Sequence, residues 1–494
     1  MAVIKPSLPK GTRDFLPEQM LRRQFVMDKI RTIFEKYGYQ PLETPSIEKL
    51  DVLSGKYGDE GEQLIFKVLK RGTGLEGLRK AAMSGARRAA KPGPAETERS
   101  ESEFVVHRYG ELVDEALRYD LTVPLSRVVA MYNRDLVYPF KRYQIQPVWR
   151  ADRPQRGRYR EFYQCDADTV GTKSMLADAE TIAIVYDVLS TLGFRKFKIR
   201  INNRKILNGI MTYAGIDPER STQVFVAIDK LEKIGLDGVK KELADREISN
   251  TEIDKILSVF EISGLVESGK DGLPSPAIDG KPETVLAELA TSFKDIEEMQ
   301  EGTKELQEIV GMLKTFDLPE SFYQIDLFLV RGLGYYTGPI HESVVEEPRI
   351  GSLTGGGRYD KLIGMFLGRD IPAVGTAFGI ERIIDVMTQL DMFPDMKTRT
   401  QVLVTIFDDA TKDASLDLCR ELRQADIRTE SYMELTKLKK QFSYADKKQI
   451  PFIAIIGPDE LAENRVTIKD LKSGEQFSVL RSDCIRELRK RLTV

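Results

Sequence analysis

Residues 141–168 constrain the fold more than any other stretch of this sequence. The first part alternates with the period of a strand, which places four residues on one side: Tyr143, Ile145, Pro147 and Trp149. Residues 159–163 are predicted to form the returning partner strand. Between the strands, eleven positions hold five arginines: Arg150, Arg153, Arg156, Arg158 and Arg160. Such a turn presents planar guanidinium groups on a rigid sheet, where they can bind phosphate and carboxylate oxygens.

An aromatic residue on the returning strand extends this interpretation. Phe162 offers a ring face on which a base can stack. The alternative is a hairpin whose arginines are only solvated surface charges, and the spacing alone does not separate the two. The rest of the chain favours a binding role.

Composition limits the chemistry that is available to this chain. Its 494 residues are enough for two or three domains, and 31% charged with 41% hydrophobic residues is ordinary for a soluble globular protein. The net charge of −3 means that any nucleic-acid contact has to come from local basic patches. Three scattered cysteines predict neither a disulfide framework nor a zinc cluster. With only His107 and His341, a Ser-His-Asp hydrolase and a His-ligated metal site are disfavoured.

The hydropathy pattern bears on where the protein works. No apolar run approaches the length that spans a bilayer. The first residues, MAVIKPSLPKGTRDF, lack the apolar core of a secretory signal and the long Arg/Ser-rich stretch of an organellar one. The sequence therefore predicts a cytoplasmic protein without a membrane partner.

The texture of the chain changes several times along its length. An amphipathic helix is predicted over residues 18–37, and strands alternate with helices over 120–200, including a helix over 174–192. Residues 72–102 are predicted to be a flexible insertion, with a basic arm that contacts RNA as the alternative. Residues 205–320 are charged and helical, which indicates a helical subdomain inserted into a sheet-based core.

The last hundred residues form a separate pattern. Strands at 402–407, 451–457 and 466–471, with a helix near 416–424 and a closing helix, predict a compact α/β unit over 399–494. A basic helix at 437–449 belongs to it, and by itself that helix is best interpreted as a solvated surface.

Six further segments, in this order and spacing, make the chain resemble the histidyl-tRNA synthetases, which are class II aminoacyl-tRNA synthetases. The segments are KGTRDFLP (10–17), EKYGYQPLETPSIE (35–48, similar to class II motif 1), RYDLTVPLSR (118–127), LVRGLGYYTG (329–338), SLTGGGRYDKLIG (352–364) and AVGTAFGIERI (373–383). The RGL and paired tyrosines at 331–336, and the GGRYD at 356–360, are specific to the histidine enzymes. Two positions depart from the family pattern, Gly334 and Ala377, and neither is an expected ligand.

The resemblance covers nearly the whole chain and implies its fold. The expected class is α/β (α+β): a class II antiparallel-sheet catalytic core over residues 1–395 with the helical insertion, and an α/β anticodon-binding domain over 399–494. Resemblance to motif 1 also implies a homodimer.

The resemblance further implies activation of L-histidine by ATP and transfer of histidine to the 3′ end of the histidine tRNA. Two anions meet when a carboxylate attacks a phosphate, so fixed cationic donors suit the transition state. The family pattern assigns catalysis to Arg150 and Arg331, and ATP binding to Arg150, Arg158, Phe162 and Arg382. It assigns histidine binding to Asp120, Leu121, Thr122, Arg150, Gln164, Asp168, Arg331, Tyr335, Tyr336 and Tyr359. Gln155 and Arg156 are expected to contact the tRNA acceptor end, and Mg²⁺ to accompany ATP without a dedicated protein site.

Three competing interpretations are weaker. A synthetase-like domain inside a stress-sensing kinase would need kinase motifs, which are absent from this sequence. A regulatory paralogue without the chemistry usually lacks the anticodon domain or the arginine at 331, and this chain retains both. A protein that only binds RNA would not need Asp168 and the paired tyrosines Tyr335 and Tyr336 around a small pocket.

Overall fold

The computed structural model describes most of the chain. The described residues are 4–56, 58–70, 113–155, 157–262, 265–267, 274–276, 281–330, 334–348, 350–395 and 397–492. The predicted insertion at 72–102 lies outside these residues. The chain divides into two compact units, one of Met1–Arg13 and Val26–Met392 and one of Asp14–Phe25 and Phe393–Val494. Among the described residues, no helix is long and apolar enough to cross a membrane.

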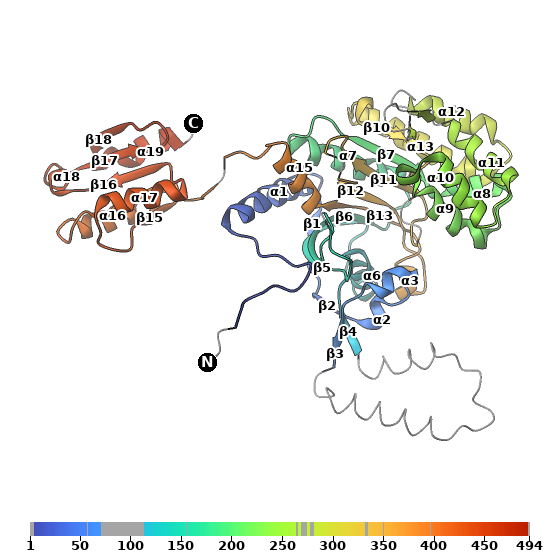
Figure 1. The fold of residues 1–494 in the computed structure, drawn as a ribbon, viewed down its shortest axis with the longest axis horizontal. Helices are drawn as coiled ribbons and strands as arrows, with labels where there is room; N and C mark the ends of the chain where they lie inside the picture. The colour runs from blue at the N-terminus through green and yellow to red at the C-terminus, as the bar shows by residue number, and fades with distance from the viewer. Residues whose placement is uncertain are drawn as a thin grey trace, which may run out of the picture. The chain divides into compact units, whose positions relative to one another are not determined.

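An eight-stranded sheet forms the centre of the first unit (Figure 1). Its strands, in spatial order, are β1 (Gln40–Pro41), β5 (Phe140–Trp149), β6 (Glu161–Val170), β13 (Ala373–Gly379), β12 (Thr354–Arg358), β11 (Pro339–Val344), β7 (Lys198–Asn203) and β10 (Tyr323–Ile325). The pairs β1–β5 and β10–β7 are parallel, and the pairs between them are antiparallel. The predicted α/β class with an antiparallel-sheet core is confirmed.

The arginine-rich segment forms the two strands that the alternation predicted. β5 and β6 pair antiparallel over their full lengths, with Tyr143 opposite Ala167 and Trp149 opposite Glu161. The connection 150–160 therefore leaves the sheet at one end, and residues on β6 return along the neighbouring strand. β6 also pairs with β13, so the hairpin lies inside the sheet and not at its edge.

Helices cover this sheet and pack their apolar side chains against those of its strands. On α1 (Pro17–Lys36), Phe34 packs with ring centroids 5.7 Å from Tyr143 and 5.6 Å from Phe378. α7 (Met175–Thr191) begins at Ser174, whose side chain accepts a hydrogen bond from the Leu176 amide, a normal N-cap. α7 lies against β6, β11, β12 and β13, and α15 (Ile380–Gln389) follows β13 directly.

Among the described residues, six α-helices lie between β7 and β10 in the sequence and gather beyond that end of the sheet (Figure 1). They are α8 (Arg204–Ala214), α9 (Ser221–Ile228), α10 (Leu231–Asp245), α11 (Asn250–Glu261), α12 (Pro282–Ser292) and α13 (Glu297–Thr315), with the short hairpin β8 (Leu265–Glu267) and β9 (Pro274–Pro276). These helices fall where the charged helical texture was noted. Their independence as a subdomain stays a prediction.

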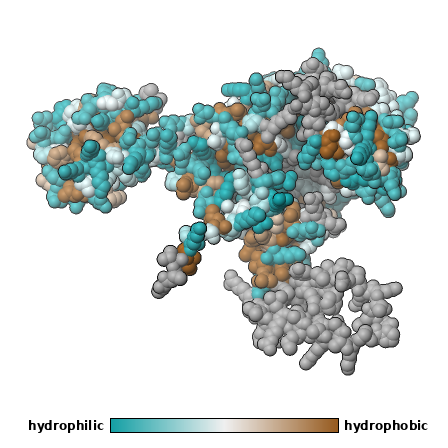
Figure 2. Space-filling view, in the orientation of Figure 1, coloured by the Kyte–Doolittle hydropathy of each residue, from teal (hydrophilic) through white to brown (hydrophobic). Residues whose placement is uncertain are grey.

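A smaller layer lies beside the other end of the large sheet. It contains the strands β2 (Ile47–Lys49), β4 (Val113–Leu117) and β3 (Lys67–Leu69) with the helices α2 (Leu50–Leu53), α3 (Gly58–Gln63), α6 (Thr122–Met131) and α14 (Gly364–Leu367). α6 begins directly after the segment 118–121, which leads from β4 into the pocket described below. Hydrophobic side chains reach the surface of this layer (Figure 2).

The second unit contains a five-stranded sheet in the order β15 (Thr429–Ser431), β14 (Val402–Val404), β16 (Phe452–Ile455), β17 (Arg465–Asp470) and β18 (Gln476–Leu480). β15, β14 and β16 are parallel to one another. β17 is antiparallel to its neighbours β16 and β18. Its helices are α16 (Lys412–Gln424), α17 (Leu438–Lys448), α18 (Pro458–Ala462) and α19 (Cys484–Leu492). Apolar residues of α16 and α19, such as Leu418 and Leu488, share one core with β14 and β16.

Stability of the first unit should depend on a buried ion pair between β12 and α7. The Arg358 guanidinium bonds the Asp178 carboxylate, and both side chains are at most 3% exposed. Asp178→Ala leaves the guanidinium buried without its counter-ion, so we expect a loss of about 3–5 kcal/mol in unfolding free energy, measured by urea denaturation. Asp417→Ala, which breaks an exposed pair with Arg420, should cost about 0–1 kcal/mol. Equal losses in the two variants would contradict a special role for burial.

Candidate functional site

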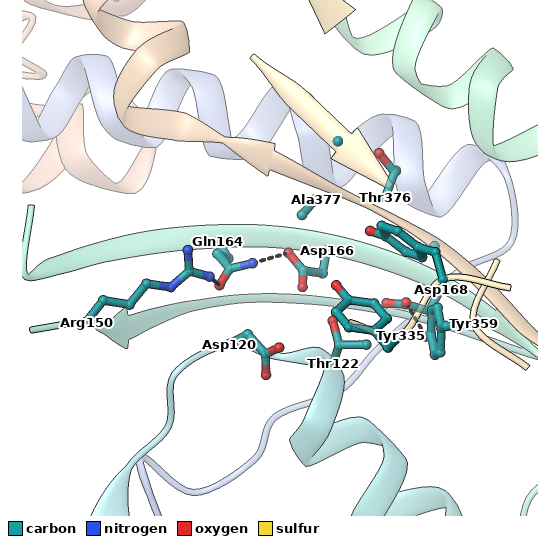
Figure 3. Close-up of a pocket in the computed structure, with 13 residues that line it drawn as sticks. Asp120, Thr122, Arg150, Gln164, Asp166, Asp168, Tyr335, Tyr359, Thr376 and Ala377 are labelled. Atoms are coloured by element: carbon teal, nitrogen blue, oxygen red, sulfur yellow. Dashed lines mark hydrogen bonds between the residues drawn. The ribbon is translucent and has the colours of Figure 1, made fainter. Parts of the chain in front are cut away.

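One polar cavity lies on the large sheet, where β6, β12 and β13 meet the start of α6 (Figure 3). Thirteen residues line it: Asp120, Thr122, Arg150, Gln164, Asp166, Asp168, Tyr335, Tyr336, Gly355, Tyr359, Gly375, Thr376 and Ala377. Eight of these belong to the histidine-binding set expected from the sequence. The structure thus brings together residues from five separate segments of the chain.

Strand alternation on β6 places three of the polar side chains in a row. Gln164, Asp166 and Asp168 are two positions apart, so all three point to the same face of the sheet. Across the row, Asp168 lies opposite Gly375 of β13. A side chain at Gly375 would collide with the Asp168 carboxylate, so this glycine leaves the space in which the carboxylate sits.

Asp168 is held from two sides inside the sheet. Its Oδ2 lies 2.7 Å from Nη2 of Arg142, whose side chain is fully buried. Its Oδ1 accepts a hydrogen bond from the hydroxyl of Tyr359. Burial raises the pKa of Asp168, and both Arg142 and the Tyr359 hydroxyl act in the opposite direction. The carboxylate is therefore fixed in orientation before any ligand arrives.

Asp166 is the charged residue of the pocket lining that the sequence analysis missed. Its side chain is nearly buried, and among the described residues it makes no ion pair. Burial, above all, raises the pKa of Asp166 well above its usual value. Arg142 and Arg150 act in the opposite direction, and the carboxylates of Asp168 and Asp120 raise the pKa further. The family pattern had already assigned Gln164 and Asp168, and strand alternation could have added Asp166, because it lies between them on the same face of β6.

Arg150 connects the pocket to the arginine-rich turn. Its Nη2 donates to Oε1 of Gln164 at 3.4 Å, and Nε2 of Gln164 donates to Oδ1 of Asp166 at 3.4 Å (Figure 3). Its Nε donates to the carbonyl of Tyr119, and the guanidinium lies 4.3 Å and 5.2 Å from the ring centroids of Tyr119 and Phe162. The cation is therefore oriented at the mouth of the pocket.

The start of α6 supplies the opposite wall. Oδ1 of Asp120 accepts a hydrogen bond from the Val123 amide at 3.1 Å, so the carboxylate caps the helix while it lines the pocket. Thr122 lines the pocket beside it. The side chain of Leu121 is fully buried and does not line the cavity, and its carbonyl accepts a hydrogen bond from Arg142 at 3.2 Å.

Three tyrosines close the inner end of the pocket. The ring of Tyr335 lies 4.6 Å from that of Tyr336 and meets the ring of Tyr359 edge-on at 6.1 Å. Burial raises the pKa of Tyr336 to about 12 and moves those of Tyr335 and Tyr359 in the same direction. All three phenols are thus neutral hydrogen-bonding groups at physiological pH. Ala377 and Thr376, neither of which was an expected ligand, also line the cavity.

The residues expected at ATP and tRNA lie outside this cavity lining. Residues 155–158 form a tight turn, with hydrogen bonds from the Gln155 amide to the Arg158 carbonyl (3.1 Å) and from the Arg158 amide back (2.9 Å). Arg382 lies in the first turn of α15 and donates to the Ser352 carbonyl at 2.8 Å. A methyl group built on Gly157 would lie 3.8 Å from the Arg382 side chain, so the turn and α15 are neighbours. Arg331 and Arg156 lie outside the described residues.

The cavity suits a small zwitterion that carries a further polar group. Arg150 can bind a carboxylate, Asp120 and Asp166 can balance a cation, and Asp168 with Tyr335 can bond a polar side chain. The large sheet is mainly antiparallel, its β5–β6 hairpin is rich in arginine, and Arg382 lies at the start of α15, the helix that follows β13. This is the arrangement of the class II aminoacyl-tRNA synthetases.

Comparisons with known proteins narrow this class. The family model of histidyl-tRNA synthetase matches residues 11–90 and 109–383, and that of the anticodon binding domain matches 401–491. Histidine–tRNA ligases from Cytophaga hutchinsonii and Bacteroides fragilis are each 42% identical, over 98% of this chain and 99% of the relative. The crystal structure of a Nostoc histidyl-tRNA synthetase superposes with a TM-score of 0.79 at 32% identity, covering 99% of this chain and 100% of that one. The chain belongs to the histidyl-tRNA synthetase family.

The contact of Gly375 with Asp168 predicts a measurable cost of adding one methyl group to the pocket floor. Besides the carboxylate, the new Cβ would lie 2.9 Å from the Ala167 carbonyl oxygen. We expect Gly375→Ala to lower the unfolding free energy by about 1–3 kcal/mol, measured by urea denaturation, because the site is overpacked. Gly311→Ala, in the exposed interior of α13 with open space around it, should be neutral or stabilise by about 0.5–1 kcal/mol. A neutral Gly375→Ala would mean that the floor can move aside.

Proposed function

We propose that this chain is a histidine–tRNA ligase that activates L-histidine with ATP to histidyl-adenylate and transfers histidine to the 3′ end of the histidine tRNA. The observation that carries the proposal is the polar cavity on the antiparallel sheet. It combines an oriented arginine with carboxylates for an ammonium group and a fixed carboxylate and tyrosines for an imidazole. Family membership over nearly the whole chain supports the same reaction.

Histidine would lie with its backbone toward Arg150 and its ring toward the tyrosines. Asp120, Thr122 and Gln164 would bind the ammonium group, with the backbone of Leu121 beside them. The imidazole has two nitrogens that differ in hydrogen bonding, so each needs its own partner. Asp168 and Tyr335 would provide these partners, and Tyr336 and Tyr359 would line the ring. Because Arg142 and Tyr359 already hold Asp168, its carboxylate can select the ring without reorganising.

ATP would bind along the outer part of the arginine hairpin. Arg150 would contact the α-phosphate and the histidine carboxylate, with Arg331 on their opposite side. Charge builds on the phosphoryl oxygens during attack, and prepositioned cations stabilise that charge. Arg158 and Arg382 would hold the outer phosphates, and Phe162 would stack on the adenine. The position of Arg382 next to Gly157 supports a shared phosphate site.

Mg²⁺ would arrive with the ATP phosphates. Among the described residues, no group of three or more His, Cys, Asp or Glu side chains could hold a metal ion. Mg²⁺ is usually bound mainly by phosphate oxygens and water, with few protein ligands. When bound, the ion would neutralise charge on the outer phosphates.

The tRNA would contact both units. Gln155, which is exposed on the tight turn, can offer a donor and an acceptor to a base edge, and Arg156 suits a phosphate. The second unit, which matches the anticodon-binding family, would bind the anticodon.

We further propose a homodimer that works in the cytoplasm. The layer around β2, β3 and β4 exposes the side chains of Ile47, Leu69 and Met131. Hydrophobic surface gathers over this layer (Figure 2). Exposed apolar patches of this kind commonly mark protein interfaces. A second copy of this chain is the partner that the motif 1 resemblance implies, and cytoplasmic translation is the process that consumes the charged tRNA.

Histidine-dependent exchange between ATP and pyrophosphate tests the function directly. We expect exchange with histidine alone among the standard amino acids, since an isostere without ring nitrogens leaves Asp168 and Tyr335 unpaired. Such sites reject the analogue by roughly 10⁴–10⁵. Comparable exchange with phenylalanine or glutamine would refute the assignment.

Asp166 should contribute to the affinity for histidine. Among the described residues its side chain makes no ion pair, although Arg142 and Arg150 lie near enough to act on its pKa, so the substrate ammonium would be the cation that contacts it directly. We expect Asp166→Asn to raise the KM for histidine about 10–100-fold, the effect of a buried charge-assisted bond, while the KM for ATP stays within about twofold. Imidazolepropionate, which lacks the ammonium group, should bind both proteins equally as an inhibitor. An equal weakening of both ligands would exclude the ammonium contact.

A further inference from the structure

The N-terminal segment KGTR, which the proposed reaction leaves without a role, packs against the arginine-rich turn. The Gly11 carbonyl accepts a hydrogen bond from the Arg160 amide at 2.9 Å. Gly11 has φ +86°, and a side chain there would lie 2.8 Å from Arg160 and 2.9 Å from Pro154. The segment therefore needs glycine at this point to approach the turn so closely.

Arg13 makes two further contacts from the same segment. Its guanidinium carbon lies 3.3 Å from the centroid of the Tyr159 ring, which is a stacked cation–π contact. Its Nη2 lies 2.5 Å from Oε2 of Glu381, a residue 368 positions away in the sequence. The Glu381 side chain is only 8% exposed, so the ion pair is shielded from solvent on that side.

Both partners of Arg13 are direct neighbours of a proposed phosphate ligand. Tyr159 follows Arg158 at the end of the tight turn, and Glu381 precedes Arg382 in the first turn of α15. Arg382 is also held by the Ser352 carbonyl, whereas the Arg158 side chain is exposed. Arg158 precedes β6 and Arg382 follows β13, and the pairing of these two strands ends at Gln164 and Gly379. Beyond that point, the contacts of Arg13 with Tyr159 and Glu381 join the turn to the helix and bear on the separation of the two phosphate ligands.

We propose that Arg13 is a positioning residue for ATP, which joins the arginine turn to the start of α15 and so sets the distance between Arg158 and Arg382. The inference rests on the proposed role of these two arginines at the outer phosphates. Two cations that must meet one triphosphate are effective only at the right separation, because misplaced donors lose most of their benefit. Arg13 itself does not need to touch ATP.

The test is steady-state ATP–pyrophosphate exchange of the full-length protein with Arg13→Gln. We expect the KM for ATP to rise about tenfold, because one partly buried ion pair and one cation–π contact that hold the phosphate ligands in place are lost. The KM for histidine and the melting temperature should stay unchanged. Arg13→Lys keeps the charge but not the planar stack, so it should recover part of the ATP affinity. Arg420→Gln, which removes an exposed arginine of the second unit, is the matched control and should change neither KM.

A double-mutant cycle locates the effect. Glu381→Gln should raise the KM for ATP like Arg13→Gln, and the double variant should be no worse than either single one, because both remove the same link. Tyr159→Leu should raise it and Tyr159→Phe should not, since the ring alone makes the contact. These variants also decide the question if Arg13→Gln folds poorly.

The outcomes separate this inference from the proposed function. Absence of histidine-dependent exchange in the unaltered protein would refute the function and, with it, this role of Arg13. Normal exchange with an unchanged KM for ATP in Arg13→Gln would refute the positioning role alone. A lower melting temperature with equal changes in both KM values would make Arg13 a residue of general stability and would likewise overturn the inference.

Discussion

The ion pair of Arg142 and Asp168 is the interaction on which the pocket depends. Both side chains are buried, and an unpaired charge of either sign at this place would lower the unfolding free energy. Arg142 also donates to the Leu121 carbonyl, so the same cation ties β5 to the start of α6. Tyr359, which directly follows β12, completes the set through its hydroxyl. Four elements are therefore positioned by one buried network before a ligand binds.

This network explains how a pocket with several carboxylates can select a single amino acid. Asp120, Asp166 and Asp168 line the cavity, and Arg150 is the one arginine among its described lining residues. Arg142, outside the lining, neutralises the charge of Asp168 through an ion pair. The two remaining carboxylates exceed the local cations, which favours a ligand that brings a positive group. Asp168, neutralised and fixed, is then free to act through hydrogen bonding. In the proposed binding mode, charge would attract the ammonium group of the substrate, and the fixed position of Asp168 would select its ring.

Local patterns predicted much of this architecture, because hydrophobic residues repeat every two residues in a half-buried strand and about every 3.6 residues in an amphipathic helix. The alternation around Tyr143 predicted β5 and its partner β6, and the expected helices at 18–37 and 174–192 are α1 and α7 with ends one residue apart. The pocket residues were reached differently, through family motifs, since nothing in the local sequence links Asp120 to Tyr335. Their common location in one cavity is a property of the fold.

Some contacts could not be predicted from the sequence, because the two residues that form them belong to no common motif. Arg142 reads as one more residue of a half-buried strand, yet its position opposite Asp168 in the β5–β6 register makes it the counter-ion of the pocket. Asp166 was passed over for the same reason: a carboxylate on a strand is ordinary until burial removes its water. Arg13 and Glu381 meet across nearly the whole length of the first unit's chain. In each case the chemistry follows from which residues the sheet brings together, so the catalytic geometry depends on tertiary pairing more than on any single motif.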